Sequence, residues 1–342
     1  MFNRIPASLL RRSMLTLAAS MALLPGAFAQ SPIVIKFSHV VAVDTPKGKA
    51  AEFFAKRAAE LTKGRVKVEV YPNSQLYKDK EELEALQLGS VQMLAPSVSK
   101  FGPFGVKEFE VFDLPFVTPD QASYLKAVGG DFGAAMLKKL DVKGVHGLAF
   151  WDAGFRVITA NKPLRKPEDF KGLKIRINSS KVIDAQMRAL GVMPQTIAFS
   201  EVYQALQTGV VDGADVTLSN VYTQKLYEVQ KYVTLLHHSH QVYAVVVNRK
   251  FWEGLPKDLR STLESAMADA TTYANGLTLA EDRNAYDKIK AAGKAALIEP
   301  TPAERDAIRA VMVQTHKDVE GRLGRETMQA LYKATEFNAG KR

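Results

Sequence analysis

The sequence contains no cysteine in its 342 residues, and it also lacks the common catalytic signatures. The missing thiols exclude a thiolate nucleophile, a thiolate metal site, a disulfide scaffold and an iron–sulfur cluster. There is no G-x-S-x-G elbow, no phosphate loop ending in Gly-Lys-Ser/Thr, no G-x-G-x-x-G after the first strand and no H-E-x-x-H. Any chemistry must therefore use oxygen and nitrogen groups, and we expect no enzyme activity and no cofactor.

A long hydrophobic run is found only near the N-terminus. Arg4, Arg11 and Arg12 precede an apolar run over 14–28 that ends in Ala27-Phe28-Ala29. This run is short for a membrane span, and small residues at a cleavage site are typical of a secretory signal peptide. We expect residues 1–29 to be removed after Ala29 and the mature chain to be periplasmic. The twin arginines leave both the general and the twin-arginine export routes open.

The formal charge of the full sequence is +10, and the charged residues are spread along the chain. Removal of residues 1–29 would take away three arginines from this total. Basic and acidic residues alternate, as in Lys78-Asp79-Lys80-Glu81-Glu82. Nucleic-acid-binding proteins instead gather basic residues on one face, so we expect no nucleic-acid partner. The positive balance would attract anionic small molecules or an anionic membrane surface.

Hydrophobic periodicity predicts alternating strands and helices. In the first part of the chain, strands are expected at 33–38, 66–70 and 91–95, and helices at 46–61, capped by Thr45, and at 78–88. Further along, the same patterns predict helices at 120–140, 181–190, 200–208 and 256–293, and strands at 145–150, 155–159, 172–177 and 243–248. This order favours a mostly parallel sheet covered by helices, and the length favours two domains. A Thr301-to-Glu304 capping box begins the C-terminal helices.

The His237-His238-Ser239-His240 cluster is the one candidate for a metal site. Adjacent strand residues point to opposite faces, and no acidic residue stands near enough in sequence to complete a site. We expect no metal there. An exported metal-dependent hydrolase built on these histidines remains the alternative from a different functional class.

Polar residues that follow the predicted strands are better candidates, because open α/β sheets bind ligands beyond the carboxyl ends of their strands. Alternation along 173–178 places Arg176 on the face opposite Ile175, and Arg matches a carboxylate with two parallel hydrogen bonds. A salt bridge at the strand end would explain Arg176 equally well. The further candidates are His39, Ser99, Lys100, Arg156, Thr217 and Asn220. For Thr217 and Asn220, capping of the helix after them is the simpler interpretation.

Several separated segments carry a family resemblance. They are Ile35-Lys36-Phe37-Ser38-His39-Val40-Val41, Tyr71-Pro72-Asn73-Ser74-Gln75-Leu76, Glu81 to Gly89, Gly172-Leu173-Lys174-Ile175-Arg176 and Val211-Asp212-Gly213. In this order they resemble the solute-binding subunit of tripartite ATP-independent periplasmic (TRAP) transporters, in its C4-dicarboxylate branch. The resemblance runs from about residue 33 to 333.

This resemblance implies a two-domain α/β periplasmic binding protein with central mixed sheets, hinge crossings and a long helix spanning both domains. We place domain I at 30–152 plus 242–281 and domain II at 153–241 plus 282–335. The resemblance also implies that Arg176 clamps a ligand carboxylate and that Arg156 assists it. The expected function is capture of a small organic acid, most simply a C4-dicarboxylate, for delivery to a TRAP permease by a monomeric receptor.

One segment departs from the family pattern. After Asp-Gly the family often shows an acidic residue, Asn and Pro, whereas here Asp212-Gly213-Ala214 is followed by Asp215-Val216-Thr217. Val216 cannot donate a hydrogen bond, so either Thr217 or Asn220 replaces that Asn, or the pocket suits a ligand with an apolar part. The identity of the acid stays open, as does a sensory role in place of transport.

Overall fold

A computed structural model describes residues 31–338 and shows an α/β fold built on one mixed sheet. The expected signal peptide at 1–29 lies outside the described residues. Within 31–338, no helix combines the length and the apolar character that a membrane crossing requires.

The sheet runs in the order β2-β1-β3-β9-β4-β7-β5-β6, with β8 paired to β4 and β10 to β8. Pairs near the two ends of this order are parallel, whereas β9 and β4 run antiparallel to their neighbours in its middle. The expectation of a mixed sheet is therefore confirmed. The strands are β1 (Ile33–Ser38), β2 (Val66–Tyr71), β3 (Met93–Leu94), β4 (Val145–Ala160), β5 (Lys174–Ile177), β6 (Met193–Thr196), β7 (Gly213–Thr217), β8 (Tyr232–Thr234), β9 (His240–Asn248) and β10 (Ala296–Ile298).

The strands predicted separately at 145–150 and 155–159 form the single strand β4. Its first part pairs with β9, and its last part pairs with β7 and β8. The register with β9 shifts between Asp152 and Phe155, where Gly154 has a φ of 86°. A positive φ is accessible to glycine at little cost, so the irregularity is accommodated within one continuous strand. β4 thus joins the part of the sheet that contains β9 to the part that contains β7 and β8.

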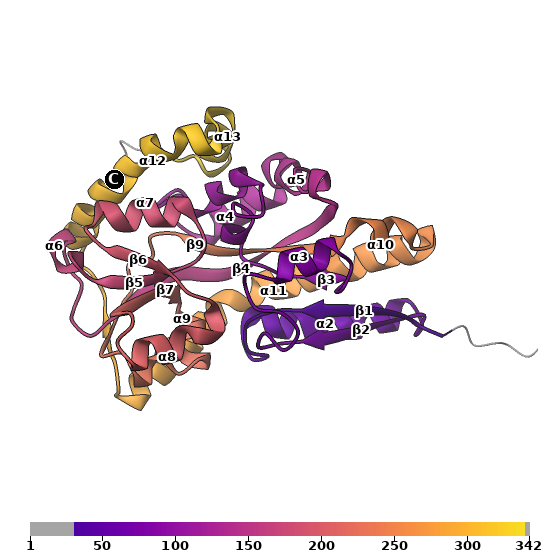
Figure 1. The fold of residues 1–342 in the computed structure, drawn as a ribbon, viewed down its shortest axis with the longest axis horizontal. Helices are drawn as coiled ribbons and strands as arrows, with labels where there is room; N and C mark the ends of the chain where they lie inside the picture. The colour runs from indigo at the N-terminus through magenta and orange to yellow at the C-terminus, as the bar shows by residue number, and fades with distance from the viewer. Residues whose placement is uncertain (1–30, 339–342) are drawn as a thin grey trace, which may run out of the picture. The chain divides into compact units, whose positions relative to one another are not determined.

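Helices cover the sheet (Figure 1). They are α2 (Pro46–Leu61), α3 (Glu82–Gln87), α4 (Gln121–Gly129), α5 (Asp131–Lys138), α6 (Pro167–Phe170), α7 (Lys181–Ala189), α8 (Val202–Gln207), α9 (Leu218–Thr223), α10 (Arg249–Gly254), α11 (Lys257–Ala292), α12 (Pro302–Leu323) and α13 (Arg325–Thr335), with 3-10 turns η1 (Val98–Lys100), η2 (Lys107–Asp113), η3 (Asp141–Lys143), η4 (Phe199–Glu201) and η5 (Leu226–Glu228).

Three of the predicted elements are shorter than expected. The helix expected over 120–140 is two helices, because extended backbone at Gly130 ends α4 and precedes α5. The helix expected from Lys78 begins only at Glu82, and in the segment 91–95 only Met93 and Leu94 pair as strand. The hydrophobic pattern continues across Gly130 and over 91–95, whereas residues 78–81 are all charged and 79–81 form a turn before α3.

The long helix α11 lies along α2 and β4 (Figure 1). Phe53 of α2 stacks on Tyr273 of α11 at 4.5 Å between ring centres, and the indole N–H of Trp151 donates to Thr271 Oγ1 at 3.1 Å. The Thr45 side chain caps α2 by accepting the Gly48 amide at 3.1 Å. These contacts confirm the predicted cap of α2 and the predicted long helix.

Candidate functional site

A small cavity with a volume of about 30 Å³ lies beyond the carboxyl ends of β1, β3, β5 and β7. Residues from the start of β9 complete its wall. This is the position at which an open α/β sheet binds its ligand. The lining residues are Val40, Val41, Asp79, Ser97, Lys100, Arg176, Asn178, Phe199, Asp215, Val216, Asn220, Gln241 and Tyr243.

A larger depression of about 550 Å³ lies elsewhere, lined largely by apolar side chains such as Phe155, Leu218 and Tyr286. It contains none of the residues that the sequence analysis selected for binding a carboxylate, although His237 of the histidine cluster lines it. The smaller cavity contains three of them, and its walls carry a concentration of charged and amide groups. We therefore take the smaller cavity as the candidate site.

Arg176 presents its guanidinium to this cavity from β5. The side chain is buried, its Nε donates to the Ile197 carbonyl at 3.0 Å, and its guanidinium carbon lies 5.8 Å from the centre of the Phe199 ring. Within residues 31–338, the two terminal nitrogens make no hydrogen bond. Burial lowers the pKa of Arg176, and the nearby carboxylates Asp79 and Asp215 oppose this. The guanidinium stays charged at any ordinary pH, so its two terminal nitrogens can donate hydrogen bonds to both oxygens of a carboxylate.

Lys100 lines the cavity beside two carboxylates of the chain itself. Its Nζ forms buried ion pairs with Asp79 and Glu82. The other oxygen of Asp79 accepts the Phe199 amide at 2.5 Å. Burial raises the pKa of Asp79, but the Lys100 ammonium and the Arg176 guanidinium outweigh it and lower this pKa to about 2. Asp79 is therefore ionised at neutral pH, and the charge of Lys100 is already compensated.

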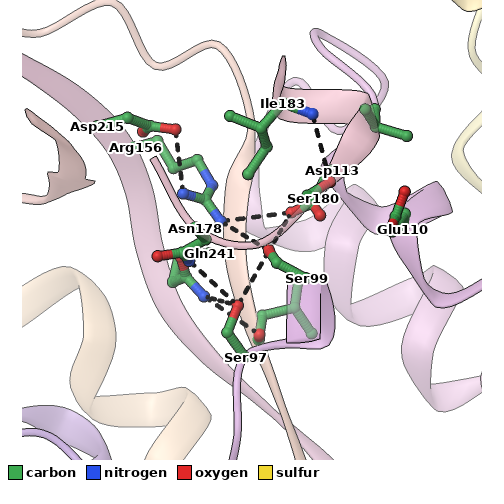
Figure 2. Close-up of polar contacts among 12 residues, drawn as sticks. Ser97, Ser99, Glu110, Asp113, Arg156, Asn178, Ser180, Ile183, Asp215 and Gln241 are labelled. Carbon is green, nitrogen blue, oxygen red and sulfur yellow. Dashed lines mark hydrogen bonds and ion pairs between the residues drawn. The ribbon is translucent and has the colours of Figure 1, made fainter. Parts of the chain in front are cut away.

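Arg156 lies behind the cavity wall in a dry ion-pair cluster (Figure 2). Its side chain is fully buried, and its terminal nitrogens donate to Asp215 at 3.2 Å, Asp113 at 3.3 Å and Ser99 at 3.4 Å. Burial raises the pKa of Asp113 to about 6, although Arg156 favours its ionised form. Of this cluster only Asp215 lines the cavity. Arg156 and Ser99 therefore act on the cavity through Asp215 and the wall.

An amide and hydroxyl chain forms another part of the wall (Figure 2). Gln241 Nε2 donates to Ser97 Oγ at 2.7 Å, and Asn178 Nδ2 contacts both Ser97 Oγ at 3.3 Å and Gln241 Oε1 at 3.1 Å. The Ser97 hydroxyl in turn donates to Ser99 at 3.1 Å. This chain joins residues after β3, after β5 and at the start of β9, so it fixes neutral donors across the sheet edge.

The segment that departs from the family pattern contributes Val216 and Asn220 to the cavity, but not Thr217. Asn220 is hydrogen-bonded to Tyr243, which also lines the cavity. Thr217 is the N-cap residue of α9, yet its hydroxyl makes no capping bond and contacts Ser219 Oγ at 3.2 Å. The expected capping by Thr217 is therefore wrong, because the Thr217 hydroxyl is hydrogen-bonded to the Ser219 hydroxyl and not to the backbone of α9. Asn220 is the amide placed beside Val216.

His39 is fully buried outside the cavity lining. Burial and the charge of Lys47 lower its pKa to about 3, so the imidazole is neutral at physiological pH. Its ring packs edge-on against Phe37 at 6.5 Å, which is the contact of a core residue.

The histidines of the 237–240 cluster have different partners, although His237 and His240 both pack on the Phe155 ring. His238 Nε2 is 3.8 Å from Asp215, whereas His240 Nδ1 is 3.1 Å from Asp152. Burial lowers the pKa of His238 to about 4. Across the described part of the chain, no three His, Cys, Asp or Glu side chains come together as a metal site would require.

Sequence reasoning did not select Asp79, Phe199, Gln241 or Tyr243, which all line the cavity. Asp79 and Phe199 lie in segments after β2 and β6, and no local pattern indicates that these segments meet. The hydrophobic run predicted a strand only from residue 243, whereas β9 begins at His240. Gln241 therefore fell outside the predicted strand. The one available signal was the polar residue Gln241 at the start of an otherwise apolar strand, which suggests a side chain with a specific polar role.

The chain is similar to several characterised binding proteins. The model of the family "Bacterial extracellular solute-binding protein, family 7" matches residues 37–322. The C4-dicarboxylate-binding periplasmic protein DctP of Rhodobacter capsulatus is 56% identical over 318 residues, which cover 93% of this chain and 95% of that protein. These matches extend over both ends of the sheet.

Two solved structures have the same fold. A TRAP periplasmic solute-binding protein of Shewanella oneidensis with bound succinate has a TM-score of 0.86 and 39% identity, covering 89% of this chain and 99% of that one. A TRAP periplasmic solute-binding protein of Pseudomonas aeruginosa with bound L-malate has a TM-score of 0.82 and 40% identity, covering 84% and 100%. The chain is therefore a member of bacterial extracellular solute-binding protein family 7.

Proposed function

We propose that this chain is a periplasmic receptor that captures a C4-dicarboxylate and delivers it to a TRAP-type permease. The observation that carries the proposal is the open, charged end of Arg176 at a small cavity beyond the strand ends. Succinate and L-malate, the ligands of the two similar structures, are both C4-dicarboxylates. Residues 1–29 would be the export signal, with cleavage after Ala29, and the mature receptor would act as a monomer without catalysis.

In this proposal Arg176 binds one carboxylate through both terminal nitrogens. Asn220, held by Tyr243, and the amides of Asn178 and Gln241 supply neutral donors for the rest of the ligand. Asn220 takes the part of the amide that Val216 replaces. Lys100 contributes a positive charge that Asp79 and Glu82 hold in place.

The remaining predicted residues have supporting parts in the proposal. Arg156 and Ser99 hold Asp113 behind the wall, and Arg156 also holds Asp215, which lines the cavity. His39 and Thr217 shape the ends of β1 and β7 next to the lining residues Val40 and Val216. None of these four residues lines the cavity, so their substitution would change the packing of the wall and would affect a ligand only indirectly.

Closure supplies the mechanism of capture. The domains that we propose, 30–152 plus 242–281 and 153–241 plus 282–335, each contribute lining residues, for example Lys100 and Arg176. A ligand that contacts both makes its full set of contacts only in the closed form, so binding shifts the population toward that form. The closed receptor would then be the form that the permease accepts.

Thermal denaturation of the mature protein against a panel of organic acids tests the proposal, since a ligand that binds only the folded state raises the melting temperature. We expect succinate, L-malate and fumarate to raise it and the monocarboxylate butanoate to have a much smaller effect at equal concentration. A response limited to aromatic or keto monocarboxylates would contradict the dicarboxylate assignment. No response to any acid would contradict the receptor function.

A further inference from the structure

Lys47 is a fully buried lysine directly behind the cavity wall. Its Nζ donates to the Ala95 carbonyl at 2.9 Å and lies 3.6 Å from the centre of the Tyr243 ring. The side chain is 2% exposed, and within residues 31–338 no carboxylate lies within 4 Å of its Nζ. A buried ammonium is normally paired with an acid. Lys47 has only a carbonyl and the face of the Tyr243 ring, and Tyr243 itself lines the cavity.

The charged and titratable groups around Lys47 come from five segments. They are His39 after β1, Asp79 after β2, Glu82 on α3, Lys100 on η1 and Tyr243 on β9. Burial and the neighbouring Lys100 lower the pKa of Lys47 to about 7, although Glu82 and Asp79 oppose this. His39 is neutral, and burial raises the pKa of Tyr243, so neither contributes charge at neutral pH.

The charges around the empty cavity do not favour a dianion unless Lys47 is protonated. The cations at the cavity and in its wall are Lys100, Arg156 and Arg176, and the carboxylates paired with them are Asp79, Glu82, Asp113 and Asp215. With all of them ionised and Lys47 neutral, the site has one negative charge in excess. Adding two carboxylates to such a site in a medium of low dielectric constant is costly. A proton taken up with the ligand removes part of that cost.

We propose that Lys47 is the residue that compensates the second carboxylate of the ligand, binding a proton through the Tyr243 side of the wall when a dicarboxylate enters. Lys47 thereby becomes a specificity determinant, because a monocarboxylate adds one charge less and draws the proton less strongly. The inference rests on the proposed function. It predicts that the receptor binds a dicarboxylate together with a proton, with the amine of Lys47 converted to the ammonium.

Calorimetry of succinate binding in buffers of different ionisation enthalpy measures the number of protons taken up. At pH 8 we expect uptake to approach one proton per succinate, and uptake to be markedly smaller for butanoate. Above pH 8 the dissociation constant for succinate should rise toward about tenfold per pH unit, because the free receptor must first gain the proton. Uptake by a carboxyl group such as Asp113 would instead fade above pH 7, so the direction of the pH profile identifies the group in the unmodified protein.

Lys47→Met keeps the apolar stem and removes the amine. We expect this variant to bind succinate at least about tenfold more weakly at pH 7, and to do so with no proton uptake at pH 8. Lys49→Met is the matched control on the same helix, since Lys49 pairs with Glu281 at 2.6 Å outside the cavity, and it should keep normal binding and uptake.

Succinate binding without proton uptake at pH 8 in the unmodified protein would overturn the inference. Unchanged uptake in a folded Lys47→Met would overturn it as well. Failure of the unmodified protein to bind any C4-dicarboxylate is a different result, because it would contradict the proposed function itself.

Discussion

The carboxylate of Asp79 accepts the backbone N–H of Phe199 at 2.5 Å. Asp79 follows β2 and Phe199 follows β6, and these strands are the two ends of the eight-strand order β2 to β6. The next pair along, Lys78 and Glu201, is also in contact, at 3.0 Å. The segments after the two outermost strands therefore meet beside the cavity and keep its two sides together.

The first prediction concerns the stability that Asp79 contributes. Its pKa is lowered to about 2 in the folded chain, below the unfolded value near 4, so its stabilisation is present above pH 4 and is lost as the pH falls toward 2. We expect Asp79→Asn to lower the free energy of unfolding by about 2 kcal/mol at pH 7. Urea unfolding should show that difference shrinking between pH 4 and pH 2.

The control is Lys78→Ala, which removes an exposed ion pair with Glu201. Exposed pairs contribute little, so this variant should change stability by less than about 1 kcal/mol. A constant difference between Asp79→Asn and the unmodified protein from pH 7 to pH 2 would show that the charge of Asp79 is not what stabilises the contact.

The second prediction concerns Arg176. Arg176→Ala should weaken succinate binding by about 2–5 kcal/mol, the usual cost of removing one partner of a buried charged pair. Arg176→Lys should recover only part of that loss, because an ammonium cannot form the two parallel hydrogen bonds. Isothermal calorimetry measures both, with Arg188→Ala as a surface control. Equal binding by folded Arg176→Ala and the unmodified protein would exclude Arg176 from the site.

The third prediction separates Asn220 from Thr217. Asn220 lines the cavity and Thr217 does not, so Asn220→Ala should weaken succinate binding by about tenfold or more, as loss of a hydrogen bond to a charged group does. Thr217→Val keeps the volume and should change binding by less than about threefold. If Thr217→Val proves the more damaging of the two, Thr217 and not Asn220 replaces the missing amide.

The fourth prediction concerns the fold around Arg156. Arg156→Met leaves Asp113 and Asp215 buried without their cation, so we expect a loss of about 3–5 kcal/mol in the free energy of unfolding at pH 7. Adding Asp215→Asn should recover part of it, since one uncompensated charge is then removed. Chemical denaturation of the single and double variants measures the coupling. Strict additivity of the two losses would contradict the ion-pair cluster.

Local patterns in the sequence predicted the parts of the fold that local chemistry determines. The Thr45 cap, the Thr301 capping box and the alternation that turns Arg176 toward the cavity all depend on neighbours a few residues away. The split of the 120–140 helix at Gly130 was missed, because the apolar positions on both sides continue the same spacing. The spacing of hydrophobic residues does not reveal that one residue, Gly130, has an extended backbone.

The site was predicted less completely than the fold. Arg176, Lys100 and Asn220 stand at strand or helix ends, where position alone suggests a ligand. The contacts of Asp79 with Phe199 and of Gln241 with Ser97 join residues 120 and 144 positions apart. Such contacts follow from the order of the strands in the sheet and from β4, which pairs with β9 in one part and with β7 and β8 in the other. No short segment of sequence contains that information.

The continuity of β4 limits how the length of this chain can change. Successive strand residues point to opposite faces, so removing one residue near the register shift at Asp152 would turn every later side chain of β4 over. Arg156 would then face away from Asp113 and Asp215, and one half of the receptor would lose its charged core. Insertions and deletions during divergence should therefore accumulate in surface loops, while the spacing from Val145 to Ala160 stays fixed.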